Sequence, residues 1–230
     1  MPLSAGLQQK LAAAHFITPT PVQEQALPHA LAGKDVLATA QTGTGKTLAF
    51  LLPIIERLSA TNSRFMEALV LVPTRELAMQ VAEQYEKLRG SKLPAAALVI
   101  GGMPERPQIK ALKSGARVVV ATPGRLEDFL GRGIADVRQV KILVLDEADR
   151  MLDMGFLPAI RRITSALPQR RQTLCFSATL EAGVAGLVND YMMNPVRVAV
   201  GSVLKPAEDV ELHAFELALR EKGNVLRRLL

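Results

Sequence analysis

Cysteine is almost absent from the sequence, and no long apolar run occurs in it. A single thiol, Cys175, excludes an internal disulfide and any metal site that several cysteines would build. The longest apolar candidate, 48–55, is far shorter than the roughly 18 residues that a membrane helix needs, and Pro53 interrupts it. The first residues also lack the charged and apolar segments of a secretory signal. We therefore expect a soluble, cytoplasmic protein without a membrane partner.

The rest of the composition is that of an ordinary globular protein. Of the 230 residues, 49% are hydrophobic and 22% are charged, which allows a sizeable core in one large α/β domain. There are 28 basic and 22 acidic side chains, so the formal net charge is +6. This balance is compatible with a phosphate-rich partner, since each neutralised phosphate releases condensed counterions. Charge alone does not establish nucleic-acid binding, because many basic proteins bind none.

Short runs of apolar, often β-branched residues alternate with longer helical segments. The runs are continuous, as is typical of strands in a parallel sheet that is covered on both faces. We expect an α/β fold with a mostly parallel central sheet, helices on both faces and ligands at the carboxyl ends of the strands. The expected strands are 35–38, 68–72, 96–100, 117–121, 142–145, 173–177 and 196–200, and the expected helices are 48–59, 76–89, 104–114, 125–130, 158–166 and 181–191.

The C-terminal part of the sequence differs from the rest. Residues 201–209 lose the apolar periodicity and are interpreted as a linker. A strand-like segment follows, and then helical residues 224–230 that lack a C-cap signal. We therefore expect a first domain over 1–204, a linker and the truncated start of a second domain over 205–230, and a larger parent protein.

Residues 40–47, AQTGTGKT, join an expected strand to an expected helix. They fit the phosphate-loop pattern, with Ala40 in place of the first glycine. The two inner glycines let successive N–H groups face phosphates at the positive end of the helix. Lys46 is expected to reach the β- and γ-phosphates, and the Thr47 hydroxyl to bind Mg²⁺. A turn without a ligand is disfavoured, because Gly-Lys-Thr lies where the chemistry requires it.

An acidic tetrapeptide, 146–149, and a Ser-Ala-Thr triplet each follow an apolar run. Asp146 is expected to hold Mg²⁺, partly through water, while Glu147 polarises the attacking water. The alternative is an acidic helix N-terminus that the helix dipole favours. The hydroxyls of Ser177 and Thr179 either bind a carboxylate, for which Asp149 is the natural candidate, or cap the next helix. Cys175 is expected to be a core thiol.

Seven motifs occur in order along the chain: FITPTPVQ (16–23), AQTGTGKT (40–47), PTRELA (73–78), GG (101–102), TPGR (122–125), DEAD (146–149) and SAT (177–179). This order resembles the N-terminal half of DEAD-box RNA helicases. The resemblance implies a RecA-like P-loop NTPase domain that binds ATP or ADP with Mg²⁺ and one part of an RNA strand. For a truncated motor domain we expect a monomer by default. The resemblance further implies ATP hydrolysis coupled to duplex unwinding, which requires a second RecA-like domain, so this chain alone should be nearly inactive. Its catalytic candidates are Lys46, Asp146, Glu147, Ser177 and Thr179, with Asp149, Ser177 and Thr179 coupling the two domains.

The resemblance assigns the segment 16–23 to adenine. It implies that Gln23 reads the base edge and that Phe16 stacks on the ring, which fits an amide that both donates and accepts hydrogen bonds. The alternative is a turn built by two prolines, with Phe16 in the core. The expected nucleotide-binding residues are Phe16, Thr18, Gln23, Thr42, Gly43, Thr44, Gly45, Lys46 and Thr47.

Three loops at neighbouring strand ends are expected to bind the RNA backbone without reading bases, through helix N-termini, hydroxyls and two arginines. For Arg75 the alternative is an ion pair with Glu76 or Asp149, and for the prolines it is helix initiation. The expected RNA-binding residues are Pro73, Thr74, Arg75, Gly102, Thr122, Pro123, Gly124 and Arg125.

The sequence departs from the family pattern at His15, where a glycine is usual, so the local turn is expected to differ. An upstream aromatic residue and the motifs of the second domain are also missing. The methionines Met151 and Met154 are interpreted as core residues. A DNA motor and a non-catalytic, ATP-gated RNA clamp stay open as alternatives, whereas a GTPase is disfavoured because the sequence has no guanine-reading Asn-Lys-x-Asp.

Overall fold

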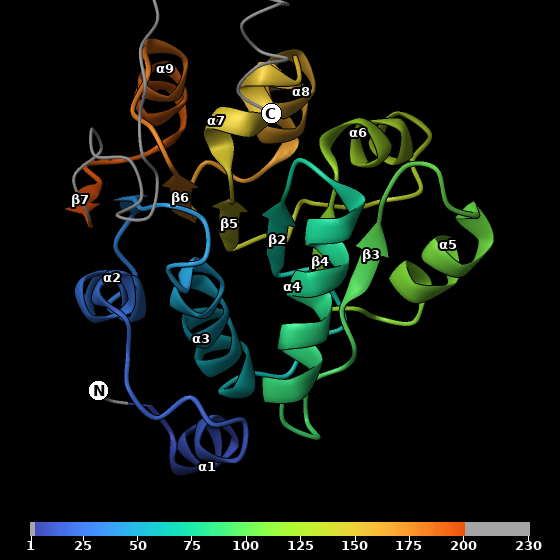
Figure 1. The fold of residues 1–230 in the computed structure, drawn as a ribbon. Coiled ribbons are helices and arrows are strands. Elements are labelled where there is room, and N and C mark those ends of the chain that lie inside the picture. Colours follow the sequence, from blue (N-terminus) through green and yellow to red (C-terminus); the bar gives the residue numbers. More distant parts are fainter. Residues whose placement is uncertain (1–2, 201–230) are drawn as a thin grey trace, which may run out of the picture.

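The computed structural model describes residues 3–200, so the expected start of a second domain lies outside the described residues. Its centre is a parallel sheet with the strand order β3-β4-β2-β5-β6-β1-β7 (Figure 1). The strands are β1 Val36–Thr39, β2 Ala68–Leu71, β3 Ala97–Val99, β4 Val118–Ala121, β5 Ile142–Leu145, β6 Gln172–Ser177 and β7 Val196–Ala199. Each of the expected strands is confirmed within about two residues of its predicted ends.

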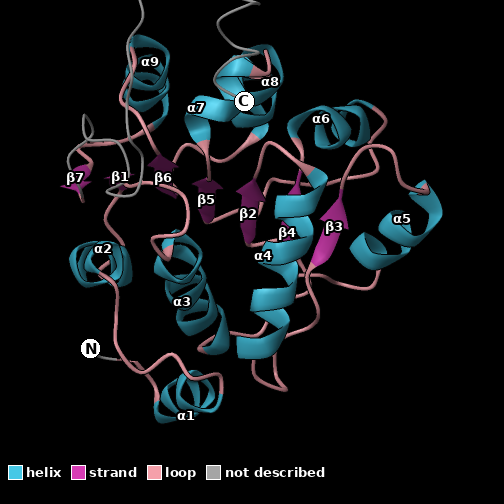
Figure 2. Ribbon diagram, in the orientation of Figure 1, coloured by secondary structure: helices cyan, strands magenta, loops and turns pink. Residues whose placement is uncertain are grey.

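Helices cover both faces of the sheet, as expected (Figure 2). The first face carries α1 to α4, the second face carries α6 to α9, and α5 packs beside the edge strand β3. Along strands β1 to β6, alternate side chains face one core or the other, because successive residues of a strand point to opposite faces. The helices are α1 Ala5–Ala13, α2 Pro21–Leu31, α3 Lys46–Ser59, α4 Arg75–Leu88, α5 Glu105–Lys113, α6 Pro123–Gly131, α7 Ala148–Asp153, α8 Leu157–Ala166 and α9 Ala182–Tyr191.

Three helices were not expected from the sequence: α1, α2 and the short α7. The segment read as a possible proline turn instead leads into α2, whose first residue is Pro21 and whose N-cap is Thr20. Proline suits the first helical position, where its missing N–H has no partner to lose. Pro28 lies inside the same helix and obscured its periodicity in the sequence.

Among the described residues, no helix has the length and apolar character that crossing a membrane requires.

A buried ionic cluster stabilises the edge where the strands begin. The Glu67 carboxylate accepts hydrogen bonds from Arg117 Nε at 2.7 Å and from Lys141 Nζ at 2.6 Å. Arg117 also donates to the carbonyl of Leu58 at the end of α3. Burial raises the pKa of Glu67, but the two cations outweigh it and hold that pKa below its usual range. The cluster is remote from the carboxyl edge of the sheet, where the motif-bearing loops lie.

Candidate nucleotide and RNA sites

The phosphate loop adopts the curled conformation that its sequence predicts. It leads from β1 into α3, and Gly43 and Gly45 have φ values of 85° and 89°, which favour glycine. Gly45 is the N-cap of α3, so Lys46 and Thr47 form the first turn at the positive end of the helix dipole. The Thr44 hydroxyl donates to the carbonyl of Gln41 at 2.7 Å, inside the loop. The backbone therefore presents to solvent a helix N-terminus of the kind that suits an anion.

Lys46 and Asp146 meet at this helix N-terminus although they are far apart in sequence. Both side chains are buried, and the Lys46 ammonium donates to the carbonyl of Ala40 at 3.0 Å. Burial raises the pKa of Asp146 to about 6, while the nearby charge of Lys46 acts in the opposite direction. A cation and a carboxylate thus flank the same space, as a phosphate–magnesium site requires.

Lys46 and Asp146 line the same cavity, whose volume of about 450 Å³ is suited to a small-molecule ligand. Every expected nucleotide-binding residue except Thr44 lines it. The sequence did not single out Leu77, Gln80 and Gln84, although their spacing places them on one face of α4. A larger cavity of about 560 Å³ lies at the opposite edge of the sheet, away from the strand carboxyl ends. The lining residues of the 450 Å³ cavity are Phe16, Thr18, Thr20, Gln23, Thr42, Gly43, Gly45, Lys46, Thr47, Leu48, Leu77, Gln80, Gln84, Asp146 and Glu147.

Gln23 connects the segment 16–23 to the phosphate loop. Its Nε2 donates to the carbonyl of Gly45 at 2.9 Å, and its Oε1 accepts from the backbone N–H of Thr20 at 3.1 Å. A Cβ at position 45 would lie 2.5 Å from Gln23 Nε2, so this close approach needs glycine. The amide keeps one further N–H and one further lone pair. Adenine reading by Gln23 therefore stays a prediction.

Phe16 lies at the mouth of the cavity and not in the core. Its side chain is 38% exposed, and the neighbouring Ile17 is 81% exposed, which contradicts the alternative of a core residue. His15 before it has a φ of 61°, the left-handed conformation that glycine favours. The N–H of Phe16 donates to the carbonyl of Leu11, and that of His15 to Ala12, which is the hydrogen-bond pattern of a glycine C-cap. The expected change of turn is therefore wrong: the histidine adopts the glycine-type turn.

Replacing His15 with glycine is expected to increase the free energy of unfolding by about 0.5–1 kcal/mol, because a side chain with a Cβ is strained in this conformation. Urea unfolding of the purified chain measures the difference. The matched control is Ala14→Gly, one residue earlier, where φ is −88° and glycine should destabilise α1. An equal loss of stability in both variants would contradict the assignment of strain to His15.

The acidic motif places its first two carboxylates at the end of β5. The Asp146 N–H donates to the carbonyl of Leu71 and continues the sheet. Glu147 has φ and ψ of 52° and 51°, a left-handed conformation that is costly for a residue with a side chain and is common at functional sites. Its carboxylate contacts Arg150 Nη1 at 3.2 Å. Both carboxylates line the cavity, which an acidic helix N-terminus alone would not explain.

Asp149 contacts the Ser-Ala-Thr segment, as expected, but not through both hydroxyls. Its Oδ2 accepts from the backbone N–H groups of Ala178 and Thr179 at 2.9 and 3.0 Å, and from Thr179 Oγ1 at 3.4 Å. Ser177 is the last residue of β6, and its buried hydroxyl has no hydrogen-bond partner among residues 3–200. The helix-cap alternative is wrong, since α9 begins only after Glu181. Neither hydroxyl lines the nucleotide cavity, so the geometry favours the coupling role over a catalytic one.

The Ser-Ala-Thr segment also touches the phosphate loop. The carbonyl of Ser177 accepts from the N–H of Ala40 at 3.0 Å. Cys175 in the same strand is fully buried, and burial raises the pKa of its thiol to about 12. The expected core thiol is confirmed.

The three loops expected to bind RNA lie together because β3, β4 and β2 are adjacent in the sheet. A second cavity of about 400 Å³ lies among them. Thr74 caps α4 by accepting from the N–H of Leu77 at 3.2 Å, and Thr122 Oγ1 accepts from the N–H of Gly101 at 3.3 Å. The cavity is lined by Pro73, Thr74, Arg75, Glu76, Gly101, Gly102, Thr122, Met154 and Phe156.

Two expectations for this face need correction. Met154 is exposed and lines the second cavity, so only Met151 is a core residue. Pro123 is buried in the first turn of α6, where it initiates the helix, and neither Gly124 nor Arg125 lines the cavity. Arg75 does contact Glu76, but at 3.8 Å and with its side chain 49% exposed, so the pair contributes little and the arginine stays accessible.

Comparisons with known proteins identify one family. The family model of the DEAD/DEAH box helicase matches residues 20–186. The DEAD-box ATP-dependent RNA helicase CshA of Streptococcus pneumoniae is 43% identical over 228 residues, which is 99% of this chain and 43% of that protein. The probable ATP-dependent RNA helicase ddx17 of Dictyostelium discoideum is 46% identical over 205 residues, or 87% of this chain and 26% of that protein. The chain thus spans less than half the length of these relatives.

Solved structures show the same architecture. A DEAD box protein from Methanococcus jannaschii aligns with a TM-score of 0.82 at 36% identity, covering 100% of this chain and 61% of the other. A hypothetical ATP-dependent RNA helicase from Sulfolobus tokodaii aligns with a TM-score of 0.79 at 36% identity, covering 86% and 57%. The expected RecA-like fold class is confirmed. With its motifs, its cavity and its family-model match in agreement, the chain belongs to the DEAD/DEAH box helicase family.

Proposed function

We propose that this chain is the ATP- and RNA-binding first motor domain of an ATP-dependent RNA helicase. The observation that carries the proposal is the convergence of Lys46, Asp146 and Glu147 on one cavity at the carboxyl edge of the sheet. A phosphate loop and a strand-end acidic pair are the two halves of an ATPase site. The names of the similar proteins support an RNA substrate for the whole protein.

The residues around the cavity divide among the parts of a nucleotide. The loop N–H groups and Lys46 would face the phosphates, while Phe16 and Gln23, which line the same cavity, would contact adenine. Thr47 and Asp146 would hold Mg²⁺, which supplies charge stabilisation to the phosphates. Among the described residues, no cluster of three or more His, Cys, Asp or Glu could hold a metal by itself. A magnesium ion here would therefore take its remaining ligands from phosphate and water.

The catalytic part of this proposal assigns Glu147 to the attacking water and Lys46 to the charge that develops on the γ-phosphate. Arginines that complete such sites accelerate hydrolysis by about 10³–10⁵-fold. In the proposal they belong to a second RecA-like domain, which closes over the cavity and is the main protein partner. The hydrogen bond between Asp149 and Thr179 joins the acidic motif to the Ser-Ala-Thr segment. In the proposal this contact couples ATP hydrolysis to closure of the second domain.

RNA would bind along the 400 Å³ cavity through its sugar-phosphate backbone. Helix N-termini, the hydroxyls of Thr74 and Thr122 and the guanidinium of Arg75 all face this side. None of these groups forms a pocket that would distinguish bases, so binding should depend little on sequence. We further propose that the protein is cytoplasmic and monomeric.

The test uses the purified 230-residue chain with Mg²⁺. We expect it to bind ADP and ATP in preference to GDP, and to hydrolyse ATP at least about 10³-fold more slowly than a two-domain helicase, because the arginines are absent. Isothermal titration calorimetry and phosphate release measure the two properties. Robust RNA-stimulated turnover by this chain alone, or equal affinity for ADP and GDP, would contradict the proposal. A parallel titration with matched single-stranded RNA and DNA tests the DNA-motor alternative.

A further inference from the structure

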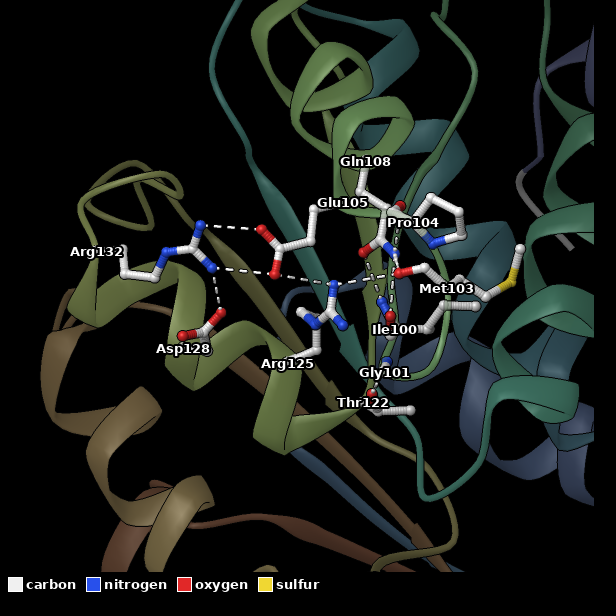
Figure 3. A network of polar contacts seen from close by, with 10 residues as sticks. All are labelled: Ile100, Gly101, Met103, Pro104, Glu105, Gln108, Thr122, Arg125, Asp128 and Arg132. Atoms are coloured by element: carbon white, nitrogen blue, oxygen red, sulfur yellow. Dashed lines mark hydrogen bonds and ion pairs between the residues drawn. The ribbon is translucent and has the colours of Figure 1, made fainter.

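Arg125 was expected to bind RNA, yet the structure turns it toward the protein (Figure 3). Its Nη1 lies 3.6 Å from Glu105 Oε1 and 3.5 Å from the carbonyl oxygen of Met103. Its guanidinium also lies over the ring of Phe129, 5.5 Å from the centroid. The side chain is only 16% exposed, against 49% for Arg75. In this arrangement the Arg125 charge is partly withdrawn from solvent.

A second arginine holds the same carboxylate more firmly. Arg132 donates to both oxygens of Glu105, from Nη1 to Oε1 at 3.1 Å and from Nη2 to Oε2 at 2.9 Å, and also to Asp128 at 2.8 Å. These hydrogen bonds hold the pKa of Glu105 below its usual range, so its carboxylate is charged at neutral pH. The bidentate geometry makes the contact with Arg132 strong, whereas the contacts of Arg125 are long and weak. Glu105 is therefore fixed in place by one arginine while it attracts the other.

The position of Arg125 makes this attraction relevant to RNA. Arg125 lies in the first turn of α6, three residues after Thr122, whose hydroxyl accepts a hydrogen bond from the N–H of Gly101 in the wall of the RNA cavity. Glu105 begins α5 just beyond the same glycine loop. We propose that the Glu105 carboxylate competes with an RNA phosphate for the Arg125 guanidinium and so weakens RNA binding. The inference rests on the proposed function and adds a positioning residue to its RNA site.

The competition predicts that removal of the carboxylate strengthens RNA binding. Glu105→Gln is expected to lower the Kd for a labelled single-stranded oligouridine about two- to fivefold, which is the range that a weak ion pair allows. It should also make the salt dependence steeper, by up to about 0.7 in log Kd against log salt concentration, because one more phosphate is neutralised. Fluorescence anisotropy of the 230-residue chain at several salt concentrations measures both. Glu105→Asp keeps the charge but shortens the side chain by one methylene, so it should give a smaller gain in affinity than Glu105→Gln.

Asp136→Asn is the charge-matched control. It changes the formal charge equally and releases another arginine, Arg138, which it contacts at 2.7 Å in the loop before β5. That loop lies at the opposite edge of the sheet, so RNA affinity should change little. An equal gain from Asp136→Asn and Glu105→Gln would overturn the proposal in favour of a general charge effect.

A double mutant makes the test specific to Arg125. Arg125→Ala should weaken RNA binding, and Glu105→Gln should then add nothing, because the group that it releases is gone. A gain that persists in the Arg125→Ala background, or a wild-type affinity for Glu105→Gln, overturns this inference and leaves the proposed function intact. A wild-type chain that binds no RNA overturns both. Thermal unfolding of each variant shows that the fold is retained.

Discussion

Replacing Lys46 with alanine is expected to weaken the binding of ADP or ATP with Mg²⁺ by on the order of 100-fold or more. Lys46 contributes the buried positive charge of the cavity, and charge-assisted hydrogen bonds to phosphate are about twice as strong as neutral ones. Without a phosphate, its ammonium donates to the carbonyl of Ala40, which already lies inside the loop. A bound nucleotide would only need to draw the ammonium from this carbonyl to its phosphates.

Titration with a fluorescent ADP analogue measures the loss of affinity. Lys34→Ala removes the same charge from an exposed position before β1, at the opposite edge of the sheet, and should leave the affinity unchanged. Thermal unfolding of both variants distinguishes a lost contact from a lost fold, since Lys46→Ala also leaves the Asp146 carboxylate without its nearest cation. If Lys46→Ala bound ADP as tightly as the wild type, the phosphate-loop assignment would fail.

Replacing Glu147 with glutamine is expected to separate binding from catalysis. In a protein that carries this chain together with a second motor domain, ATP turnover should fall by about 10²–10⁴-fold, because an amide cannot act as a general base toward water. Nucleotide affinity should change less than about threefold, since the amide has the same shape and its oxygen can still accept the contact from Arg150. The left-handed backbone of Glu147 is equally available to glutamine.

Single-turnover hydrolysis and an ADP titration give the two quantities. Glu83→Gln, on the exposed face of α4, is the control and should alter neither. A parallel fall of affinity and turnover would mean that Glu147 holds the nucleotide or the fold and not the water. Unchanged turnover would remove Glu147 from the catalytic set altogether.

The motifs form one hydrogen-bonded arrangement at the carboxyl edge of the sheet. Gln23 binds the phosphate loop at Gly45, the loop binds the Ser-Ala-Thr segment through Ala40, and that segment binds Asp149. If a nucleotide displaced one of these contacts, the backbone groups of the adjoining motifs would shift as well. This chain of contacts is the physical reason to expect that occupancy of the cavity influences the surface that a second domain would meet.

The helices show where sequence patterns were sufficient and where they were not. The amphipathic α3 and α4 have apolar faces that the sequence displays directly, and both were predicted within two residues. In α1 only Leu7 is buried, and α2 contains Pro28, so neither carries a clear periodic signal. Their helical state is decided by packing against α3 and α4.

The strands, the phosphate loop and the acidic strand end could be predicted from local patterns, because each residue type in those patterns has a fixed task. The partner of each polar side chain could not be predicted in this way and depends on the three-dimensional fold. The fold separated Ser177 from Asp149, brought Met154 to the RNA side and turned Arg125 toward Glu105. Such contacts join segments that the strand order brings together across the sheet. Where a side chain can reach two partners, the packing around it decides which one it contacts, and no local sequence pattern encodes that packing.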